Sequence, residues 1–344
     1  MEFDLMTGGA ANSWTQSANF AKQLQDAGFS GLLYTETSSV PWMSITAAAM
    51  AAPEMFFTTG IAVAFPRSPM VSAAVAYEIN GNTGGRFRLG LGSQVKAHVE
   101  RRYASEFDRP AARIRDYILA VKACFRAFNR DEKLSHEGDF YNLSLLPPDW
   151  APRRHDHPMH VDISAVGPMM VKVAGEVADG VHVHPLHSMP YIENRLLPGL
   201  ADGAAKADRV VDDIELIVPV FACPGDSPEA RAEYVSTAKR QIAFYGSTPN
   251  YHFQFDDLGF EGTTGRIRNK FKAGELDTIG DVITDEMLEH YAVVAAWDEM
   301  ADKLLDRYRG TAGRVVIYLG ESQMRNDPDH LAKWGEIARA VRAG

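Results

Sequence analysis

The chain alternates short apolar runs with longer amphipathic stretches, and this alternation constrains its fold more than any single motif does. The apolar runs are rich in Val, Ile, Leu and Phe, which is typical of strands that are buried on both faces of a sheet. Each run is followed by at least one stretch with helical periodicity. The predicted strands cover residues 3–6, 31–36, 57–63, 87–92, 160–165, 180–184, 214–222 and 314–319.

Eight strands that are each followed by a helix predict a (β/α)8 TIM barrel. A doubly wound open sheet is the alternative, but such a sheet usually carries a GxGxxG turn after its first strand, and this sequence has none there. The predicted helices cover residues 14–27, 44–51, 71–82, 111–128, 168–178, 190–205, 228–244, 285–308 and 331–342.

Two connections are much longer than a barrel needs, and they predict insertions after strands 4 and 7. The first runs from about residue 93 to 159 and the second from about 224 to 313. Residues 245–280 of the second are rich in Gly, Thr, Asp and aromatic side chains, which suggests a lid or a partly ordered excursion. The sequence shows neither internal repeats nor a linker, so we expect a single domain over residues 1–344.

Composition excludes several classes of function. Lys and Arg number 35 and Asp and Glu 45, so the net charge of −10 argues against nucleic-acid binding. No apolar run approaches the roughly 20 residues that span a bilayer, and the acidic start does not resemble a secretory signal. The two cysteines, Cys124 and Cys223, lie far apart. We therefore expect a cytoplasmic protein that acts on a small molecule, without a membrane or nucleic-acid partner.

A barrel places its chemistry at the carboxyl ends of its strands, and several polar residues follow strands here. Glu36 ends strand 2, where its carboxylate would enter the barrel mouth, although a helix-capping or loop carboxylate is the alternative. After strand 4, Gly92 allows a close approach of the backbone, while Ser93 and Gln94 can hydrogen-bond a polar ligand.

The loops after strands 5 and 6 predict an anion site. Free N–H groups at a helix start attract phosphate, and a helix opens at Pro168 directly after strand 5. Histidines after strand 6 invite a metal interpretation, but a metallohydrolase barrel would add carboxylates and an early HxH pair, so we expect no metal. Hydrogen bonding to a polar cofactor tail is favoured. The residues concerned are Ala165, Val166, Gly167, His184, Pro185, Leu186 and His187.

Several motifs, taken in order along nearly the whole chain, resemble the luciferase-like monooxygenase superfamily. They are residues 60–70, GIAVAFPRSPM; 84–94, GGRFRLGLGSQ; 109–113, RPAAR; 136–141, HEGDFY; 174–180, AGEVADG; and 291–294, YAVV. Within the superfamily, the chain looks most like the branch of oxidoreductases that use the deazaflavin coenzyme F420.

The resemblance implies a flavin-type ring bound at the strand ends, with a non-prolyl cis peptide at Ala62–Val63 that backs the ring. Glu36 matches the acid that ends strand 2, but Thr37 replaces the histidine that usually follows it, so the proton donor is open. Trp42 matches an aromatic side chain near the ring. His98 is a further acid–base candidate beside His184.

These observations lead to one expected function and three alternatives. We expect F420-dependent hydride transfer between the deazaflavin and a small organic substrate. The alternatives are an FMN-dependent monooxygenase of the same fold, a non-catalytic flavin-binding barrel and, more distantly, a metal-dependent hydrolase. Relatives are often dimers, so a homodimer is expected. Cations that would meet the anionic cofactor tail at the rim are Arg67, Lys96, Arg101 and Arg102.

Overall fold

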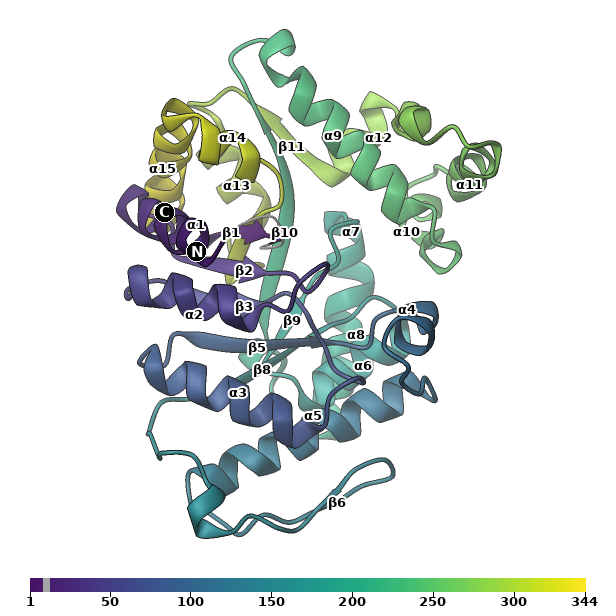
Figure 1. Cartoon of the computed structure of the whole chain (residues 1–344). Helices are drawn as coiled ribbons and strands as arrows, with labels where there is room; N and C mark the ends of the chain where they lie inside the picture. Colours follow the sequence, from purple (N-terminus) through teal and green to yellow (C-terminus); the bar gives the residue numbers. More distant parts are fainter. Residues whose placement is uncertain (9–12) are drawn as a thin grey trace.

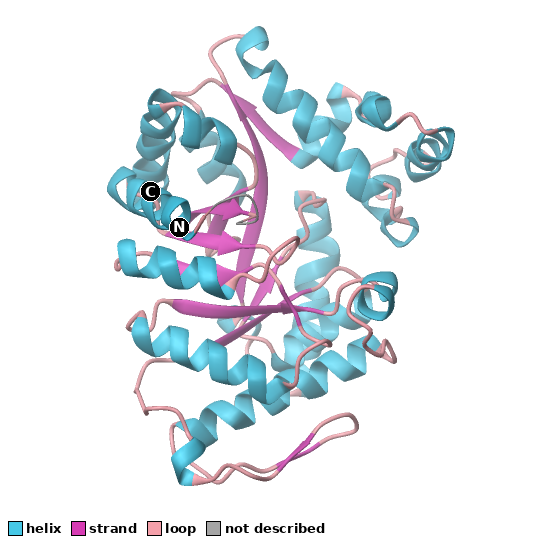
Figure 2. Ribbon diagram, in the orientation of Figure 1, coloured by secondary structure: helices cyan, strands magenta, loops and turns pink. Residues whose placement is uncertain are grey.

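Eight parallel strands close into a barrel that is surrounded by helices in the computed structural model, which describes residues 1–8 and 13–344 (Figures 1 and 2). Neighbouring strands follow one another around the barrel in chain order, and β10 closes the ring by pairing with both β9 and β12. The predicted (β/α)8 TIM barrel is therefore confirmed. The barrel strands are β1 (Glu2–Thr7), β2 (Gly31–Tyr34), β3 (Phe56–Thr59), β5 (Phe87–Gly92), β8 (His160–Ser164), β9 (Gly180–His182), β10 (Glu215–Pro224) and β12 (Arg314–Ile317).

The helices begin and end at the residue types that favour such boundaries. At the start of α1, Ser13 and Gln16 form a reciprocal capping box, and Gly28 ends the helix with a φ of 104°, which favours glycine. At the start of α3, the Ser68 side chain accepts the Val71 N–H. The principal outer helices are α1 (Trp14–Ala27), α2 (Trp42–Ala51), α3 (Pro69–Asn82), α5 (Pro110–Phe128), α6 (Pro168–Val177), α8 (Leu197–Lys206) and α15 (Pro328–Ala343).

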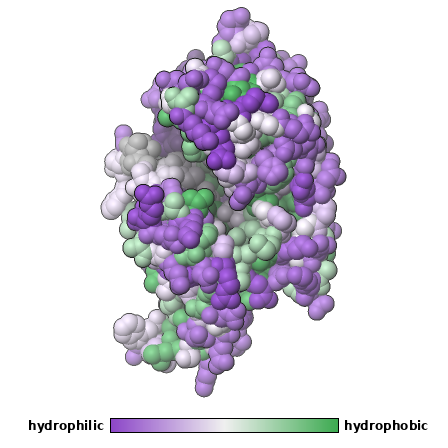
Figure 3. All heavy atoms as spheres, turned by 90° about the vertical axis from the view of Figure 1, so that its right-hand side faces the viewer, coloured by the Kyte–Doolittle hydropathy of each residue, from purple (hydrophilic) through white to green (hydrophobic). Residues whose placement is uncertain are grey.

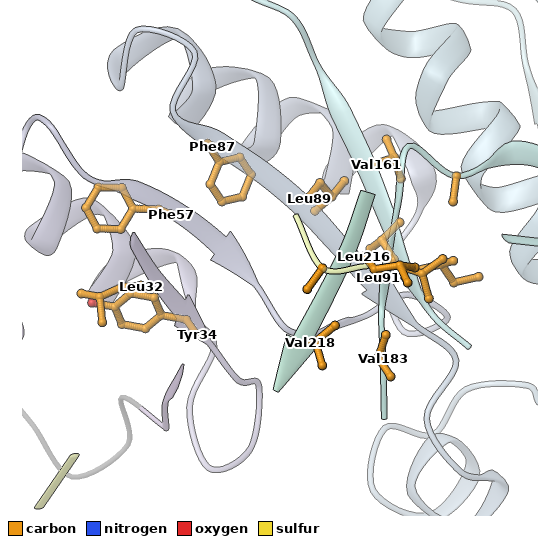
Figure 4. Close-up of a cluster of buried hydrophobic side chains, with 14 of the residues drawn as sticks. Leu32, Tyr34, Phe57, Phe87, Leu89, Leu91, Val161, Val183, Leu216 and Val218 are labelled. Atoms are coloured by element: carbon orange, nitrogen blue, oxygen red, sulfur yellow. The ribbon is translucent and has the colours of Figure 1, made fainter. Parts of the chain in front are cut away.

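The two faces of each strand have different environments, as the alternation of side chains requires. Side chains that point outward pack under the helices and form the main core, part of which Figure 4 shows with Leu32, Phe57, Leu89 and Val161 among its members. This packing uses the apolar runs that predicted the strands.

The inner face of the barrel carries buried ion pairs near the amino ends of the strands. The Arg314 guanidinium donates to both oxygens of Asp4, at 2.6 and 2.9 Å, and Arg88 binds Asp162 in the same way at 2.8 and 2.6 Å. Above them lies a small apolar layer of Leu33, Ile217, Val316 and the partly buried Met6. These layers fill the interior and leave the carboxyl ends of the strands for a ligand.

The insertion after β5 contains α4 (Lys96–Arg101), α5 and a short hairpin of β6 (His136–Glu137) and β7 (Asn142–Leu143), which projects from the barrel in Figure 1. The Asp116 carboxylate holds the hairpin, since it lies 2.7 Å from the His136 Nε2 and accepts the Phe140 N–H at 2.7 Å. Beyond the hairpin, η1 (Pro148–Trp150) leads towards β8.

The insertion after β10 packs around an apolar core of its own. Two expectations are corrected here. Residues 245–280 are not a partly ordered excursion, because they fold into short helices, and residues 285–308 are not one helix. Ala292–Ala295, with two β-branched valines, instead forms a strand beside the far half of β10. The elements are α9 (Pro228–Gly246), η4 (Pro249–Tyr251), α10 (Phe253–Asp256), α11 (Thr263–Ala273), η5 (Leu276–Val282), α12 (Asp285–Tyr291), β11 (Ala292–Ala295) and α13 (Met300–Tyr308).

Within the described residues, no helix is long and apolar enough to cross a membrane.

Candidate functional site

The mouth of the barrel is built from small residues on one side and aromatic residues on the other. It opens where the strands end, on the right in Figure 1, and Figure 3 faces this end of the molecule. Side chains alternate along a strand, so the last inward side chains of β9, β10 and β12, and those of the inward residues just beyond each strand, point into the mouth. The small positions are Gly60, Gly92 and Ser164, and the aromatic ones are His184, Phe221 and Tyr318.

The glycines on the small side leave room for other parts of this chain. A Cβ at Gly92 would lie 2.7 Å from both the Ile61 side chain and the Ser164 Oγ, so any side chain there would clash with both groups. Deeper in the barrel, a Cβ at Gly90 would lie 2.4 Å from the His182 Nε2. A close approach to the Gly92 backbone was expected for a ligand. In the structure, the Ile61 side chain and the Ser164 Oγ lie close to Gly92.

The non-prolyl cis peptide lies between Gly60 and Ile61, which corrects the expected position at Ala62–Val63 by two residues. Ala62 and Val63 form the short strand β4 and pair regularly with Leu91 and Gly92 of β5. The bend falls at Gly60 because a Cβ there would lie 2.2 Å from the Leu33 Cδ2. Only glycine fits the turn of the backbone over the inner apolar layer.

Glu36 is held in a buried ion pair. Arg67 donates to its Oε1 at 2.5 Å and to its Oε2 at 2.8 Å, and the Val63 N–H donates to Oε2 at 2.8 Å. Arg67 also donates to the Val63 carbonyl at 2.8 Å and lies 5.7 Å from the centre of the Trp42 ring. The carboxylate thus ties β2 to β4, and both of its oxygens have donors.

The residues after β5 lie at the rim. The side chain of His98 is exposed on α4, and Ser93 and Gln94 are partly exposed. Gln94 has a φ of 58°, and the Ser93 Oγ lies 3.3 Å from the Gln94 carbonyl oxygen. Of the rim cations, Arg102 is committed to the Thr37 carbonyl, and Lys96 lies 3.6 Å from Glu100.

The loop after β8 presents an open helix start. Ala165 is buried, and the Tyr191 hydroxyl fixes the next residue by donating to the Val166 carbonyl at 3.1 Å. Gly167 caps α6 without a side-chain hydrogen bond, and a Cβ added there would meet nothing within 4 Å. The first N–H groups of α6 therefore have the space and the polarity to receive an anion.

The two histidines after β9 have different surroundings. The Leu186 N–H donates to the His184 Nδ1 at 3.0 Å, and burial lowers the pKa of His184 to about 3. His187 turns away from the mouth, where its Nε2 lies 3.3 Å from the Tyr308 hydroxyl, and burial lowers its pKa to about 4. Leu186 is buried in the core of the second insertion, and Pro185 is partly exposed.

Sequence reasoning missed several groups that the fold brings to the mouth. Ser164 ends β8 and Tyr318 directly follows β12, both at inward positions, so extending the alternation of side chains along these strands would have found them. Tyr245 and Tyr251 come from α9 and η4, and no local signal places them over the barrel. No cluster of three or more metal-ligating side chains is found in residues 1–8 and 13–344.

Comparison with known proteins gives a consistent family. The family model described as luciferase-like monooxygenase matches residues 1–314. An uncharacterised protein of Mycobacterium tuberculosis is 34% identical over 320 residues, covering 92% of this chain and 94% of that protein. A candidate coenzyme F420-dependent oxidoreductase of the same organism is 25% identical over 289 residues, covering 76% of this chain and 78% of the other.

Solved structures share the fold. The coenzyme F420-dependent tetrahydromethanopterin reductase of Methanopyrus kandleri superposes with a TM-score of 0.76 at 18% identity, covering 97% of each chain. An EDTA monooxygenase from Chelativorans reaches a TM-score of 0.72 at 12% identity, covering 99% of this chain and 94% of that one. At these identities, the likeness establishes a shared barrel only.

Proposed function

Because the chain belongs to the luciferase-like monooxygenase family, we propose that it is an F420-dependent oxidoreductase. The sequence likeness to a candidate F420-dependent oxidoreductase over 76% of the chain carries this proposal. An FMN-dependent monooxygenase is the alternative, because the family model that matches the chain is that of luciferase-like monooxygenases. The residues of the mouth do not distinguish the two tricyclic rings, so the choice between the cofactors rests on the relatives.

The ring is proposed to lie on the small side of the mouth, over the bend at Gly60 and Ile61 and beside Ser164. Small side chains allow a flat ring to approach the backbone there. The anionic end is proposed to reach Gly167, where the uncapped start of α6 offers N–H groups into open space. When bound, the deazaflavin supplies hydride chemistry at its reactive carbon, and the protein supplies binding and orientation.

The chain's own residues would fix this arrangement in different ways. The ion pair of Glu36 and Arg67 ties β4, the strand that directly follows the bend, to the loop after β2. Tyr191 fixes the loop that leads into α6. Trp42 lies beside Arg67 at the edge of the mouth. In this proposal, Glu36 positions the backbone, and its service as a proton donor remains the second hypothesis.

A pair of variants at one position tests the placement of the cofactor. Gly167→Glu adds a negative charge at the proposed anion site, and Gly167→Gln adds a side chain of the same size without the charge. Both should fold, since a Cβ at Gly167 meets nothing within 4 Å. We expect Gly167→Glu to weaken deazaflavin binding by about tenfold or more relative to Gly167→Gln, measured by absorbance titration. Equal affinities in two folded variants would refute this placement.

A further inference from the structure

The aromatic side of the mouth presents four polar rings, from His184, Tyr245, Tyr251 and Tyr318, which we call the aromatic wall. The ring centre of His184 lies 4.9 Å from that of Tyr245 and 4.8 Å from that of Tyr251, both in edge-to-face arrangements. The hydroxyls of Tyr245 and Tyr318 are 2.5 Å apart. All four side chains are partly exposed. The wall thus combines the end of the barrel with α9 and η4 of the second insertion.

The hydrogen bonds of His184 decide which of its nitrogens carries the proton. Its Nδ1 accepts the Leu186 N–H at 3.0 Å, so this nitrogen holds a lone pair and no proton. Burial lowers the pKa of the ring to about 3, so it is neutral near pH 7. A neutral imidazole with an accepting Nδ1 must be protonated at Nε2. No described residue accepts a hydrogen bond from that Nε2–H, which remains a donor for a ligand.

The tyrosine pair also keeps a donor in reserve. Two hydroxyls carry two protons, and one of these is used between Tyr245 and Tyr318. No other hydrogen bond from either hydroxyl, or from the Tyr251 hydroxyl, is made to a described residue. Tyr291 provides the contrast, since it is 1% exposed and its hydroxyl donates to the Gln254 carbonyl at 2.6 Å. The buried Tyr291 thus uses its proton within the protein, whereas the partly exposed wall has free donors.

The wall carries no charge with which to bind an ion. None of its four members takes part in an ion pair with a residue in the described part of the chain. The nearest strand-end acid after β12, Glu321, is itself paired with Arg325 at 2.8 Å. An anionic ligand placed against the wall would lose its hydration without gaining a cation, which is costly.

We propose that the aromatic wall binds the substrate, and that the substrate is an uncharged, flat molecule with a carbonyl or imine group that accepts hydrogen bonds. The aromatic faces and edges pack against the flat body. The Nε2–H of His184 and the free hydroxyl of the tyrosine pair orient the accepting atom. This inference rests on the proposed function, because the cofactor ring would occupy the opposite, small side of the mouth.

Acetophenone and benzoate are suitable probes, because they are similar in size and flatness but differ in charge. Isothermal titration of the full chain should detect acetophenone, with benzoate bound at least about tenfold more weakly. Nitrogen-15 NMR with labelled histidine provides a second readout. Acetophenone should shift the His184 Nε2 signal, which begins as that of a neutral Nε2–H tautomer. Benzoate binding as tightly as acetophenone, or an unmoved His184 signal, would overturn the proposal.

Tyr318→Phe removes one hydroxyl of the pair, and Tyr234→Phe is the matched control. Tyr234 lies on the same helix as Tyr245, and its hydroxyl has no hydrogen-bond partner among the described residues. Tyr318→Phe leaves the Tyr245 hydroxyl without the partner that orients it, so acetophenone should bind about three- to tenfold more weakly, and Tyr234→Phe should leave its affinity unchanged. Equal effects of both variants would contradict a role for the wall.

Cofactor titration of the same proteins separates the two proposals. The deazaflavin affinity of Tyr318→Phe should equal that of the unmodified chain, because the ring lies on the other side of the mouth. If acetophenone binds at the wall but the deazaflavin does not bind, the proposed function fails and the substrate site stands. If the deazaflavin binds and acetophenone does not, the proposed function stands and the aromatic wall is refuted.

Discussion

Glu36→Gln should destabilise the barrel, because the change falls on a carboxylate that is fully engaged. Its Oε2 accepts two hydrogen bonds, from Val63 and Arg67, and its Oε1 accepts one from Arg67. In the more favourable orientation, the glutamine oxygen replaces Oε2, and the amide NH2 then faces the Arg67 Nη2, which is also a donor. One charge-assisted bond is lost and two donors are brought together.

The magnitude follows from the burial of the pair. The Glu36 side chain is 2% exposed and that of Arg67 is 17% exposed, so water replaces little of what is lost. Removing one partner of a buried pair costs about 3–5 kcal/mol, and a hydrogen bond to a charged group contributes about 1.5–3 kcal/mol. Since glutamine keeps one neutral acceptor, we expect the free energy of unfolding to fall by about 2–4 kcal/mol.

Equilibrium unfolding in urea measures this loss, with Glu54→Gln as the matched control, since Glu54 is exposed and its carboxylate makes no ion pair with a described residue. The control should stay within about 0.5 kcal/mol of the unmodified chain. Adding Arg67→Met to Glu36→Gln should recover part of the stability, because no unpaired cation is then left buried. A Glu36→Gln variant as stable as the control, with slowed hydride transfer, would refute the positioning role and support proton donation.

Three further changes test other parts of the structure. Gly60→Ala should lower the free energy of unfolding by roughly 1–3 kcal/mol, because its Cβ would lie 2.2 Å from Leu33. Gly265→Ala in α11 should raise it slightly, because a Cβ there meets nothing within 4 Å and alanine favours a helix. Urea unfolding of both variants measures the two changes. Lowering the pH from 7 to 5.5 should lower the free energy of unfolding by about 1 kcal/mol through His187. Its pKa of about 4 in the folded chain lies below the unfolded value of about 6.5, so the unfolded state binds more protons and stability is lost as the pH falls. His187→Gln should remove this contribution to the pH dependence of the free energy of unfolding. If the expected homodimer forms through the exposed apolar groove between α1, α2 and α3, Met50→Glu should yield monomers in sedimentation experiments, and Leu276→Glu, at another exposed apolar position, should not.

The apolar runs predicted the barrel because the outward side chains of the parallel strands pack under the helices. Residues 87–92 and the helix at 14–27 were predicted with the bounds that the structure shows. The strand at 292–295 was missed because four residues between helical segments carry too little pattern. Its strand form depends on pairing with β10, a partner about 70 residues earlier in the chain.

The candidate site was predictable only at the strand ends. Strand alternation placed His184 in the mouth, and the helix start at Gly167 follows directly from Pro168. The ion pair of Glu36 with Arg67 was not predictable, because the two residues are 31 positions apart and the segment between them carries no signal of contact. The tyrosines of α9 and η4 reach the mouth through the packing of the second insertion, and long-range packing of this kind leaves no local pattern.

Competition between the two cofactors tests the central claim most directly. The purified chain is titrated with oxidised deazaflavin and with FMN under the same conditions, and each is then used to displace the other, with absorbance and fluorescence as readouts. Our account predicts that the deazaflavin binds at least about tenfold more tightly and displaces FMN. FMN bound as tightly as the deazaflavin, or more tightly, would contradict the assignment and favour the FMN-dependent monooxygenase.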